Sequence, residues 1–317
     1  MKILVTGGAG FIGFHVSKAM LERGDEVVIV DNFNNYYDPE LKYARIAQIK
    51  KHKALKVYKT DISDYKKLEK IFKNHKFDKI CHLAAQAGVR YSLKDPFRYE
   101  LWNNLGTLNV LELAIKYNVK DFVYASSSSI YGGNKKIPFS EEDRVDSSVS
   151  IYAATKKANE LYAHVYHHIY GLNCTGLRFF TVYGPWARPD MALFLFVEKI
   201  IKGKEIEINN YGKMKRDFTY ISDIVDGVLA AIDKPFGYEI FNIGNNKPVE
   251  LNNFVEIIEK ELGIKAKRKM MPLQEGEVIV TRANIKKAKK MLGYSPKVGI
   301  EKGVKEFVKW YKEYFKV

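Results

Sequence analysis

A tyrosine and a lysine four positions apart, Tyr152 and Lys156 in YAATK, are the residue pair in this sequence best suited to acid–base chemistry. On a helix this spacing places both side chains on one face. A tyrosine is a poor base, because its ordinary pKa is about 10. A unit positive charge about 4 Å away contributes roughly 4 kcal/mol at an intermediate dielectric, which is about three pKa units. Lys156 is therefore expected to lower the pKa of the phenol far enough for Tyr152 to act as a base.

A run of four serines, within ASSSSIYG at residues 125–132, lies about 25 residues before this pair. Serine runs are common in loose linkers, but this one follows the apolar segment DFVY, where a buried strand is expected to end. That position favours a set of hydroxyl groups directed at a substrate over a solvated turn. Because Y-x-x-x-K spacings are frequent by chance, the pair gains its meaning from this serine-rich strand end and from a glycine-rich motif near the N-terminus.

The glycine-rich segment GGAGFIG, at residues 7–13, directly follows the apolar run KILVT and opens an amphipathic stretch. In this setting Gly7 permits the tight turn, Gly10 lets the backbone approach a pyrophosphate, and Gly13 lets the helix pack on the strand. The helix N-terminus adds free N–H groups and a positive dipole end. The next apolar run ends at Asp31, whose carboxylate would accept hydrogen bonds from ribose hydroxyls and repel a 2′-phosphate. The motif therefore predicts NAD rather than NADP, and an oxidised nicotinamide would add a second positive charge beside the phenol.

Short apolar runs alternate with amphipathic stretches over the first 180 residues, a pattern typical of a parallel sheet with helices on both faces. We expect strands at KILVT, EVVIV, LKVYK, KICHLA, DFVYAS and NCTGLRF, and helices near 12–23, 39–51, 64–74, 96–117 and 151–170. Beyond residue 180 we expect strands at IEIN and FNIG, and helices near 191–202, 222–232, 251–262, 283–291 and 300–315.

The expected fold class is therefore α/β, a Rossmann-type doubly wound parallel sheet with a smaller, partly interleaved C-terminal α/β substrate lobe. We expect the NAD-binding Rossmann domain to comprise residues 1–180 and roughly 215–250. The substrate lobe would then be formed by roughly 181–214 and 251–317.

Composition narrows the class of protein. The chain has 317 residues, 46% of them apolar, and a formal charge of +15. Its lysines are scattered over helix faces without interleaved arginines and aromatics, so we expect no nucleic-acid partner, although a basic field attracts an anionic small substrate. The sequence contains no apolar stretch of about 20 residues, so we expect no membrane span, and we expect no signal peptide before the first strand.

Cysteine and histidine residues are expected to be structural. Cys81 and Cys174 lie in apolar runs, where a buried thiol is the usual outcome, which fits a cytoplasmic protein. His164, His167 and His168 have no cysteine or carboxylate at ligand spacing, so we expect no metal site.

The motifs taken together resemble the extended short-chain dehydrogenase/reductase family, in its nucleotide-sugar branch of NAD-dependent epimerases and dehydratases. GGAGFIG, HLAAQAGVRYS, SSSSIYG, YAATK, RFFTVYGPWARPDM and RDFTYISDIV follow the family's order over essentially the whole chain. By this resemblance the catalytic hydroxyl lies four residues before the tyrosine of IYG, at Ser127. It implies that Ser127 hydrogen-bonds the sugar's 4-hydroxyl, that Tyr152 takes its proton, and that Lys156 holds the nicotinamide ribose while hydride passes from carbon 4 to NAD.

The resemblance also implies the set of residues that contact NAD. Asp61 is expected near the adenine and Phe179 against the nicotinamide. The full set is Gly7, Gly10, Phe11, Ile12, Gly13, Asp31, Asn32, Asp61, Ile62, Leu83, Ala84, Ala85, Tyr152, Lys156 and Phe179.

The serine run distinguishes among the reactions of this family. Its 4,6-dehydratases are similar but place an Asp-Glu pair beside the catalytic hydroxyl, where this chain has Ser128 and Ser129. Elimination of water therefore lacks its acid and base. Uronate decarboxylases and the 4-epimerases of neutral or uronic sugars remain.

A uronate substrate sets a sharp physical demand. Oxidation of carbon 4 of UDP-glucuronate makes a β-keto acid, which loses carbon dioxide when its carboxylate bond aligns with the carbonyl π system. An epimerase must hold the carboxylate away from that alignment. Hydroxyls of Ser127, Ser128, Ser129 and Thr181 are candidates, because charge-assisted hydrogen bonds are about twice as strong as neutral ones. Arg188 would add a guanidinium fork near the uronate, although Ala187 stands where we expect glycine and restricts the backbone there.

The remaining substrate contacts are implied by the same resemblance. Arg216 and Arg282 are expected at the diphosphate, Met191 over the uracil, and Arg90 near the nicotinamide side of the pocket. The full substrate set is Ser127, Ser128, Ser129, Arg90, Thr181, Arg188, Met191, Arg216 and Arg282.

The resemblance is closest to the UDP-glucuronate 4-epimerases. It implies reversible conversion of UDP-glucuronate to UDP-galacturonate through a 4-keto intermediate, with tightly bound NAD and no decarboxylation. The alternatives are a UDP-glucose/UDP-galactose 4-epimerase, a UDP-glucuronate decarboxylase that makes UDP-xylose, or a non-catalytic NAD- or RNA-binding protein. The apolar stripes at 96–117 and 151–170 imply a homodimer through a four-helix bundle, as in relatives.

Overall fold

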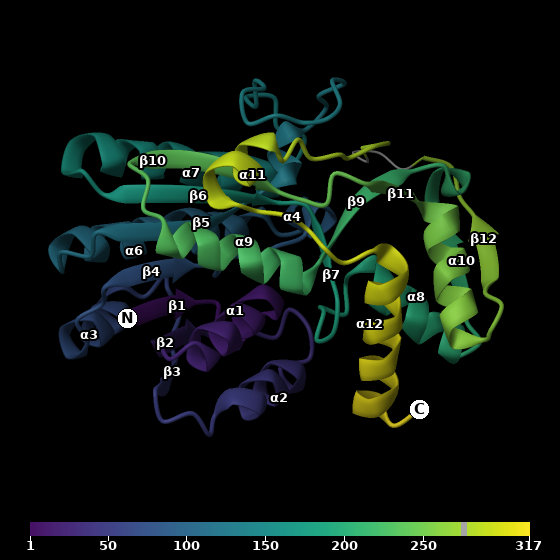
Figure 1. Cartoon of the computed structure of the whole chain (residues 1–317), viewed down its shortest axis with the longest axis horizontal. Coiled ribbons are helices and arrows are strands. Elements are labelled where there is room, and N and C mark those ends of the chain that lie inside the picture. Colours follow the sequence, from purple (N-terminus) through teal and green to yellow (C-terminus); the bar gives the residue numbers. More distant parts are fainter. Residues whose placement is uncertain (274–277) are drawn as a thin grey trace.

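A seven-stranded, wholly parallel sheet forms the centre of the computed structural model, which describes residues 1–273 and 278–317 (Figure 1). The strands lie in the order β10–β6–β5–β4–β1–β2–β3. Their bounds are β1 Lys2–Thr6, β2 Glu26–Asp31, β3 Leu55–Lys59, β4 Lys79–His82, β5 Asp121–Ser127, β6 Asn173–Phe179 and β10 Tyr238–Ile243. This is the order of a dinucleotide-binding sheet extended by one strand, and it confirms the predicted fold class.

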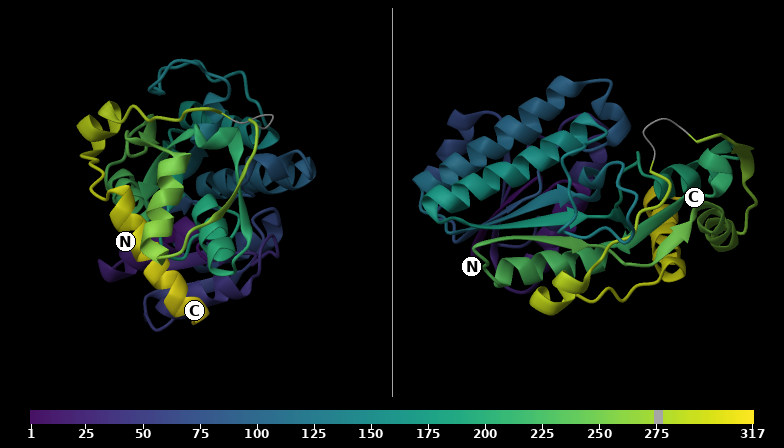
Figure 2. Two further views of the ribbon diagram at one scale, coloured as in Figure 1. Left: turned by 90° about the vertical axis from the view of Figure 1, so that its right-hand side faces the viewer. Right: turned by 90° about the horizontal axis from the view of Figure 1, so that it is seen from above.

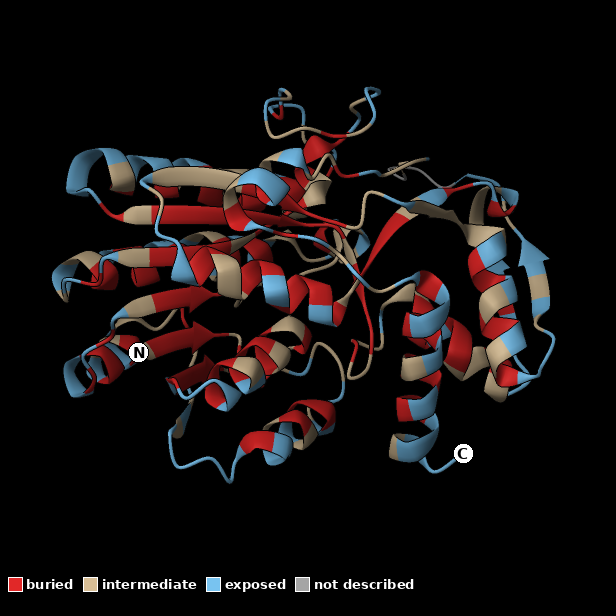
Figure 3. Cartoon of the chain, in the orientation of Figure 1, coloured by how far each residue is buried: buried red, intermediate tan, exposed pale blue. Residues whose placement is uncertain are grey.

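The central strands are apolar on both faces, which is why they are read as continuous hydrophobic runs rather than alternating ones. In β1, Ile3 and Val5 face one side of the sheet, while Leu4 faces the other side together with Val28 and Val30 of β2. These central strands are buried along nearly their whole length (Figure 3). The sheet therefore requires a helical layer on each face.

Two helical layers cover the sheet (Figure 2). On one face α1 packs against α9, and on the other α3, α6 and α7 lie over the strands. The bounds are α1 Phe11–Glu22, α2 Glu40–Ile49, α3 Tyr65–Asn74, α6 Gly106–Lys116, α7 Ile151–Tyr170, α9 Ile221–Asp233 and α11 Lys286–Leu292. The helix predicted near 96–117 is observed as three joined segments, α5 Pro96–Tyr99, the π-helical η1 Glu100–Leu105 and α6.

A smaller lobe is built from later segments around two short sheets. A three-stranded sheet has the order β11–β9–β7, and β12 pairs with β8. The bounds are β7 Thr181–Tyr183, β8 Glu205–Ile208, β9 Lys215–Tyr220, β11 Pro248–Glu250, β12 Lys267–Met270, α8 Ala192–Ile201, α10 Leu251–Leu262 and α12 Ile300–Phe315. The pattern analysis missed β7, β11 and β12, which have only three or four residues each.

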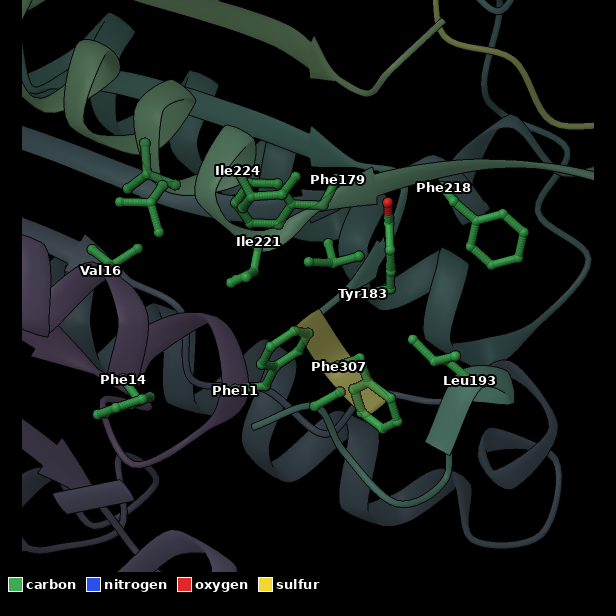
Figure 4. Packing of buried hydrophobic residues seen from close by; sticks show 14 of the residues in the cluster. Phe11, Phe14, Val16, Phe179, Tyr183, Leu193, Phe218, Ile221, Ile224 and Phe307 are labelled. Atoms are coloured by element: carbon green, nitrogen blue, oxygen red, sulfur yellow. The ribbon is translucent and has the colours of Figure 1, made fainter. Parts of the chain in front are cut away.

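One apolar cluster joins the two parts of the chain. It includes Phe14 of α1, Ile224 of α9, Phe218 of β9, Leu193 of α8 and Phe307 of α12 (Figure 4). Strand β9 belongs to the small sheet. The next elements along the chain lie with the large sheet, because α9 packs on it and β10 forms its edge strand. The chain therefore crosses between the two sheets within the range 215–250, and the domain limits given above stay a prediction.

The described parts of the chain include no helix that is both long and apolar enough to cross a lipid bilayer. Cys81 and Cys174 are buried free thiols, as predicted.

Candidate active site

A cavity of about 540 Å³ lies at the carboxyl edge of the large sheet and extends to the small lobe. Loops that follow parallel strands meet at one edge, so residues distant in sequence share this cavity. Of the predicted residues, those that line it are Gly7, Gly10, Phe11, Ile12, Gly13, Asp31, Asn32, Ile62, Leu83, Ala84, Ala85, Arg90, Ser127, Ser128, Ser129, Tyr152, Lys156, Phe179, Thr181, Arg188, Met191 and Arg216.

The glycine-rich loop has the close approaches that the motif predicts. Gly7 has a left-handed φ of +70°, and a Cβ there would lie 2.7 Å from the Ala84 Cα. A Cβ on Gly13 would lie 2.2 Å from the Gly7 carbonyl oxygen. Helix α1 begins at Phe11 with no side-chain cap, so its first N–H groups point to the cavity edge as an anion site. These residues fit the pyrophosphate of a dinucleotide.

Asp31 is held firmly at the end of β2. Its carboxylate accepts hydrogen bonds from the backbone N–H of Ala9 at 3.1 Å and of Phe33 at 2.8 Å. Lys42 of α2, which the sequence analysis missed, lines the same cavity, and its Nζ donates to the Asn34 carbonyl and side chain. Burial lowers the pKa of Lys42, although the Asp31 carboxylate opposes this shift. The sequence signal for Lys42 would have been its place beside Leu41 on the buried face of α2, where a lysine is unusual.

Two predicted ligands do not line the cavity. Asp61 accepts hydrogen bonds from the Asn32 side chain at 2.8 Å and from Ser63, and its contact with the adenine stays a prediction. Arg282 donates from Nε to Asn246 Oδ1 at 2.9 Å. Its neighbour Thr281 lines the cavity instead.

The catalytic pair is positioned by the start of α7. Ser150 caps this helix by accepting the Ala153 N–H at 3.1 Å, which places Tyr152 and Lys156 in its first two turns. The Lys156 Nζ donates to the Ala125 carbonyl of β5 at 2.8 Å. Burial lowers the pKa of Lys156 to about 8.

The pKa of Tyr152 departs from the predicted direction in the protein alone. Burial raises this pKa, while the hydrogen-bonded Ser127 hydroxyl and the Arg188 charge act to lower it. Lys156 does not lower it in this setting, so the lowered value predicted from the Tyr-Lys spacing needs a further positive charge. An oxidised nicotinamide at this edge of the cavity carries such a charge.

The four serines face different partners. Ser127 Oγ accepts hydrogen bonds from the N–H of Ser129 and from its hydroxyl at 2.9 Å, within the turn η2 Ser128–Tyr131. The Ser126 hydroxyl instead donates to Glu160 at 2.7 Å. Glu160 forms a buried, two-point ion pair with Arg178 at the end of β6. This pair ties α7, the serine turn and β6 together beneath the site.

Arg188 already has an internal carboxylate partner. Its Nε and Nη2 donate to the two oxygens of Asp190 at 2.9 and 2.7 Å, and the Tyr36 hydroxyl donates to Asp190 at 3.2 Å. Burial would raise the pKa of Asp190, but the Arg188 guanidinium outweighs it and the pKa is held below its usual value. Burial and the Asp190 charge raise the pKa of Tyr36 to about 12. The sequence analysis missed both Asp190 and Tyr36.

Other predicted positions fall as follows. Trp186, with a φ of +64°, carries the left-handed backbone, while Ala187 is buried without it, so the missing glycine causes no strain there. The Arg216 Nη1 donates to the carbonyls of Lys215 and Ile279.

No group of three or more metal-binding side chains occurs within residues 1–273 and 278–317.

Comparisons with known proteins agree with this geometry. A sequence model of the GDP-mannose 4,6 dehydratase family matches residues 4–307. UDP-glucuronate 4-epimerase 4 of Arabidopsis thaliana is 49% identical over 333 residues, covering 99% of this chain and 76% of that protein.

Two solved structures show the same fold over 99% of this chain and 100% of theirs, each at 33% identity. One is UDP-glucuronic acid 4-epimerase of Bacillus cereus in complex with UDP-glucuronic acid and NAD, with a TM-score of 0.93. The other is UDP-glucose 4-epimerase of Thermotoga maritima with UDP-glucose, with a TM-score of 0.91.

The buried Lys156 predicts a trade between stability and activity. Because folding lowers its pKa from 10.5 to about 8, the charged form costs stability below pH 8, and this cost disappears as the pH rises to 10.5. Lys156→Met should therefore abolish turnover and raise the free energy of unfolding at pH 7 by about 1–2 kcal/mol, after the loss of one hydrogen bond.

Urea denaturation at pH 7 and pH 10 measures this effect, with bound dinucleotide quantified because a ligand adds to apparent stability. The gain should shrink at pH 10. Lys66→Met, on the exposed face of α3, is the matched control and should change little. A Lys156→Met protein less stable than the wild type at pH 7 would contradict the assignment of a strained buried cation.

Proposed function

The chain belongs to the GDP-mannose 4,6 dehydratase family of the extended short-chain dehydrogenase/reductases, and on that premise we propose that it is an NAD-dependent UDP-glucuronate 4-epimerase. The proposed reaction is the reversible conversion of UDP-glucuronate to UDP-galacturonate. The observation that carries the proposal is a cavity in which Ser127, Tyr152 and Lys156 lie with several hydroxyl groups and a guanidinium. The family model is named for dehydratases, but Ser128 and Ser129 supply no acid or base for elimination.

The glycine-rich loop, Asp31 and Lys156 would hold NAD, which would supply a hydride acceptor for carbon 4 of the sugar and a hydride donor to its opposite face. Tyr152 takes the proton of the 4-hydroxyl, and the Ser127 hydroxyl, already hydrogen-bonded to the phenol, orients that oxygen. We propose that Lys156, whose Nζ donates to the Ala125 carbonyl, holds the nicotinamide ribose and so places the positive charge of the nicotinamide beside the phenol. We propose that the glycine-rich loop and Asp31 hold the adenosine diphosphate end.

The carboxylate of the substrate must be kept from aligning with the 4-keto group. We propose that Ser128, Ser129 and Thr181 donate to it and that Arg188 approaches it. The Ser129 hydroxyl donates to Ser127 in the ligand-free chain, so it must turn from that partner to reach the sugar. Asp190 already occupies the Arg188 fork, so the uronate competes with an internal carboxylate for the same donors.

The uridine diphosphate end provides the anchor about which the keto sugar turns. We propose that Arg216 of β9 binds the diphosphate and that Met191, at the start of α8, closes over the uracil. Met191 lies in the smaller lobe, which we propose comprises roughly residues 181–214 and 251–317, and Arg216 lies on β9, the middle strand of the small three-stranded sheet. With the nucleotide held there and NAD held by the large sheet, the sugar between them can rotate without release. The buried thiols and the dependence on NAD support a cytoplasmic location.

The first test is turnover. Incubation of the purified protein with UDP-glucuronate, followed by proton NMR of the sugar, should give UDP-galacturonate. Accumulation of UDP-xylose would make the protein a decarboxylase. Interconversion of UDP-glucose and UDP-galactose without turnover of the uronate would reject the uronate assignment. Tyr152→Phe is the control and should lose nearly all activity while keeping its NAD, because only the phenolic proton acceptor is removed.

Thr181 provides a test of the restraint on the carboxylate. Thr181→Ala removes one charge-assisted hydrogen bond, so the decarboxylated fraction of the product should rise by roughly tenfold. The same NMR assay measures both products. Thr175→Ala, in β6 and away from the cavity, is the matched control and should leave the ratio unchanged. An unchanged product ratio in Thr181→Ala would reject its proposed role.

We further propose a homodimer formed through α6 and α7. These helices lie side by side and leave apolar side chains exposed at helical spacing. The exposed residues are Leu101, Leu105 and Leu108 on η1 and α6, and Leu161, Val165 and Ile169 on α7. Two such stripes on one face are an apolar patch that a monomer rarely leaves in water, and a second copy would bury them as a four-helix bundle.

Leu161→Glu tests the dimer, because it places a charge in the middle of the proposed interface. Light scattering coupled to size-exclusion chromatography should show a dimer for the wild type and a monomer for this variant. Ile264→Glu, which alters an exposed apolar residue after α10, should remain dimeric. A wild-type protein that runs as a monomer at micromolar concentration would overturn the proposal.

A further inference from the structure

Arg45 of α2 is a fully buried arginine that no predicted role explains. Its guanidinium makes five hydrogen bonds, all to uncharged oxygens. It donates to the Ala9 carbonyl at 3.0 Å and to the Tyr37 hydroxyl at 2.7 Å. It also donates twice to the Trp186 carbonyl, at 3.1 and 2.7 Å, and once to the Ala187 carbonyl at 3.4 Å.

The hydrogen bonds of Arg45 reach two loops that border the cavity, the glycine-rich loop and the loop that precedes Arg188. Ala9 lies between Gly8 and Gly10 in the glycine-rich loop, which fits a pyrophosphate. Ala187 directly precedes Arg188, whose guanidinium lines the cavity and is proposed to approach the uronate. One planar fork therefore spans the coenzyme loop and the substrate loop, a geometry that a lysine, with its single nitrogen, does not reproduce.

His15 of α1 holds the same loop one residue earlier. Its Nε2–H donates to the Pro185 carbonyl at 2.9 Å. Burial lowers the pKa of His15 to about 4, so the ring is neutral at pH 7 and donates from Nε2 in a defined tautomer. Three consecutive carbonyls, those of Pro185, Trp186 and Ala187, are thus bound by side chains from α1 and α2.

The loop would not keep this shape by local preference. Trp186 has a φ of +64°, a left-handed conformation that is unfavourable for a bulky residue and persists only where the surroundings impose it. Its ring is fixed by Phe14, Trp310 and Tyr314, and its carbonyl by Arg45. The backbone before Arg188 is therefore set by contacts with α1 and α2, which flank the glycine-rich loop, and with α12.

We propose that Arg45 is a positioning residue that holds the segment 184–191 in register with the glycine-rich loop, so that Arg188 is presented to the substrate carboxylate. Arg45 does not reach the cavity lining itself and acts through the loop. The part of this proposal that concerns the uronate rests on the proposed function, whereas the ordering of the loop does not.

Hydrogen exchange with mass spectrometry on the NAD-bound protein tests the ordering of the loop. Arg45→Lys keeps the charge but loses the fork, so amides in 184–191 should exchange at least tenfold faster while β5 stays protected. His15→Leu, which removes only the Pro185 contact, should give a smaller change in the same segment and serves if Arg45→Lys does not fold. Arg23→Lys is the control and should leave 184–191 unchanged, because the ion pairs of Arg23 are with Asp25 and with Asp233 at the end of α9. Unchanged exchange of 184–191 in both test variants, or a uniform rise over all strands, overturns the proposal.

A binding cycle tests the route through Arg188. Calorimetry on the NAD-bound protein should show that Arg45→Lys weakens UDP-glucuronate about tenfold and UDP, which has no uronate, less than twofold. In an Arg188→Met background, Arg45→Lys should add less than twofold, because both changes remove one interaction. The proposal that Arg45 acts through Arg188 is overturned if the affinities for UDP and UDP-glucuronate fall equally, or if Arg45→Lys keeps its full tenfold effect in the Arg188→Met background. A wild-type protein that neither binds nor converts UDP-glucuronate rejects the proposed function, while the exchange result still decides whether Arg45 orders the loop.

Discussion

Parallel pairing of the seven central strands is the constraint on which the site depends. Because every strand runs the same way, the loops after β1, β2, β4, β5 and β6 all emerge at one edge. The glycine-rich loop, Asp31, the serine turn and Phe179 are brought together by this arrangement alone, although they are spread over more than half of the chain. Burial of both sheet faces by helices fixes the edge, and the small lobe then closes the cavity over it.

The charged groups at this edge are balanced by different means. Buried Lys156 donates a hydrogen bond to one backbone carbonyl, that of Ala125. Arg188 is paired with Asp190, and Arg45 donates only to uncharged oxygens. Each arrangement leaves positive charge close to where a dinucleotide and a nucleotide sugar would bring phosphates and a carboxylate. The positive charge of the site therefore favours anionic ligands. The positions of Lys156, Arg188 and the loops they hold determine where the phosphates and the carboxylate of a ligand can bind. The same cations hold the loops in place, so binding and architecture are coupled.

Local pattern predicted much of the fold and part of the site. The apolar runs and amphipathic stretches mark most strands and helices to within a few residues, and the glycines and the Tyr-Lys spacing lead directly to the cavity. The remaining features depend on contacts between distant residues. Asp61 and Arg282 are held by Asn32, Ser63 and Asn246, partners that no local pattern shows. Asp190 and Arg45 act through contacts with residues about 140 to 150 positions distant, to Tyr36 and to Trp186. Strands as short as β7 and β11 are set by pairing with β9, because three residues carry no period of their own.

In the proposed epimerisation, hydride leaves carbon 4 and returns to the same sugar without release of the keto intermediate. UDP-glucuronate labelled with deuterium at carbon 4 tests this step directly, with mass spectrometry and NMR of the product after turnover in ordinary water. If the hydride returns to the same sugar, UDP-galacturonate keeps the deuterium at carbon 4 in full. Loss of the label to solvent, or its appearance on NAD alongside a free keto sugar or a decarboxylated pentose, would show that the intermediate is released or diverted.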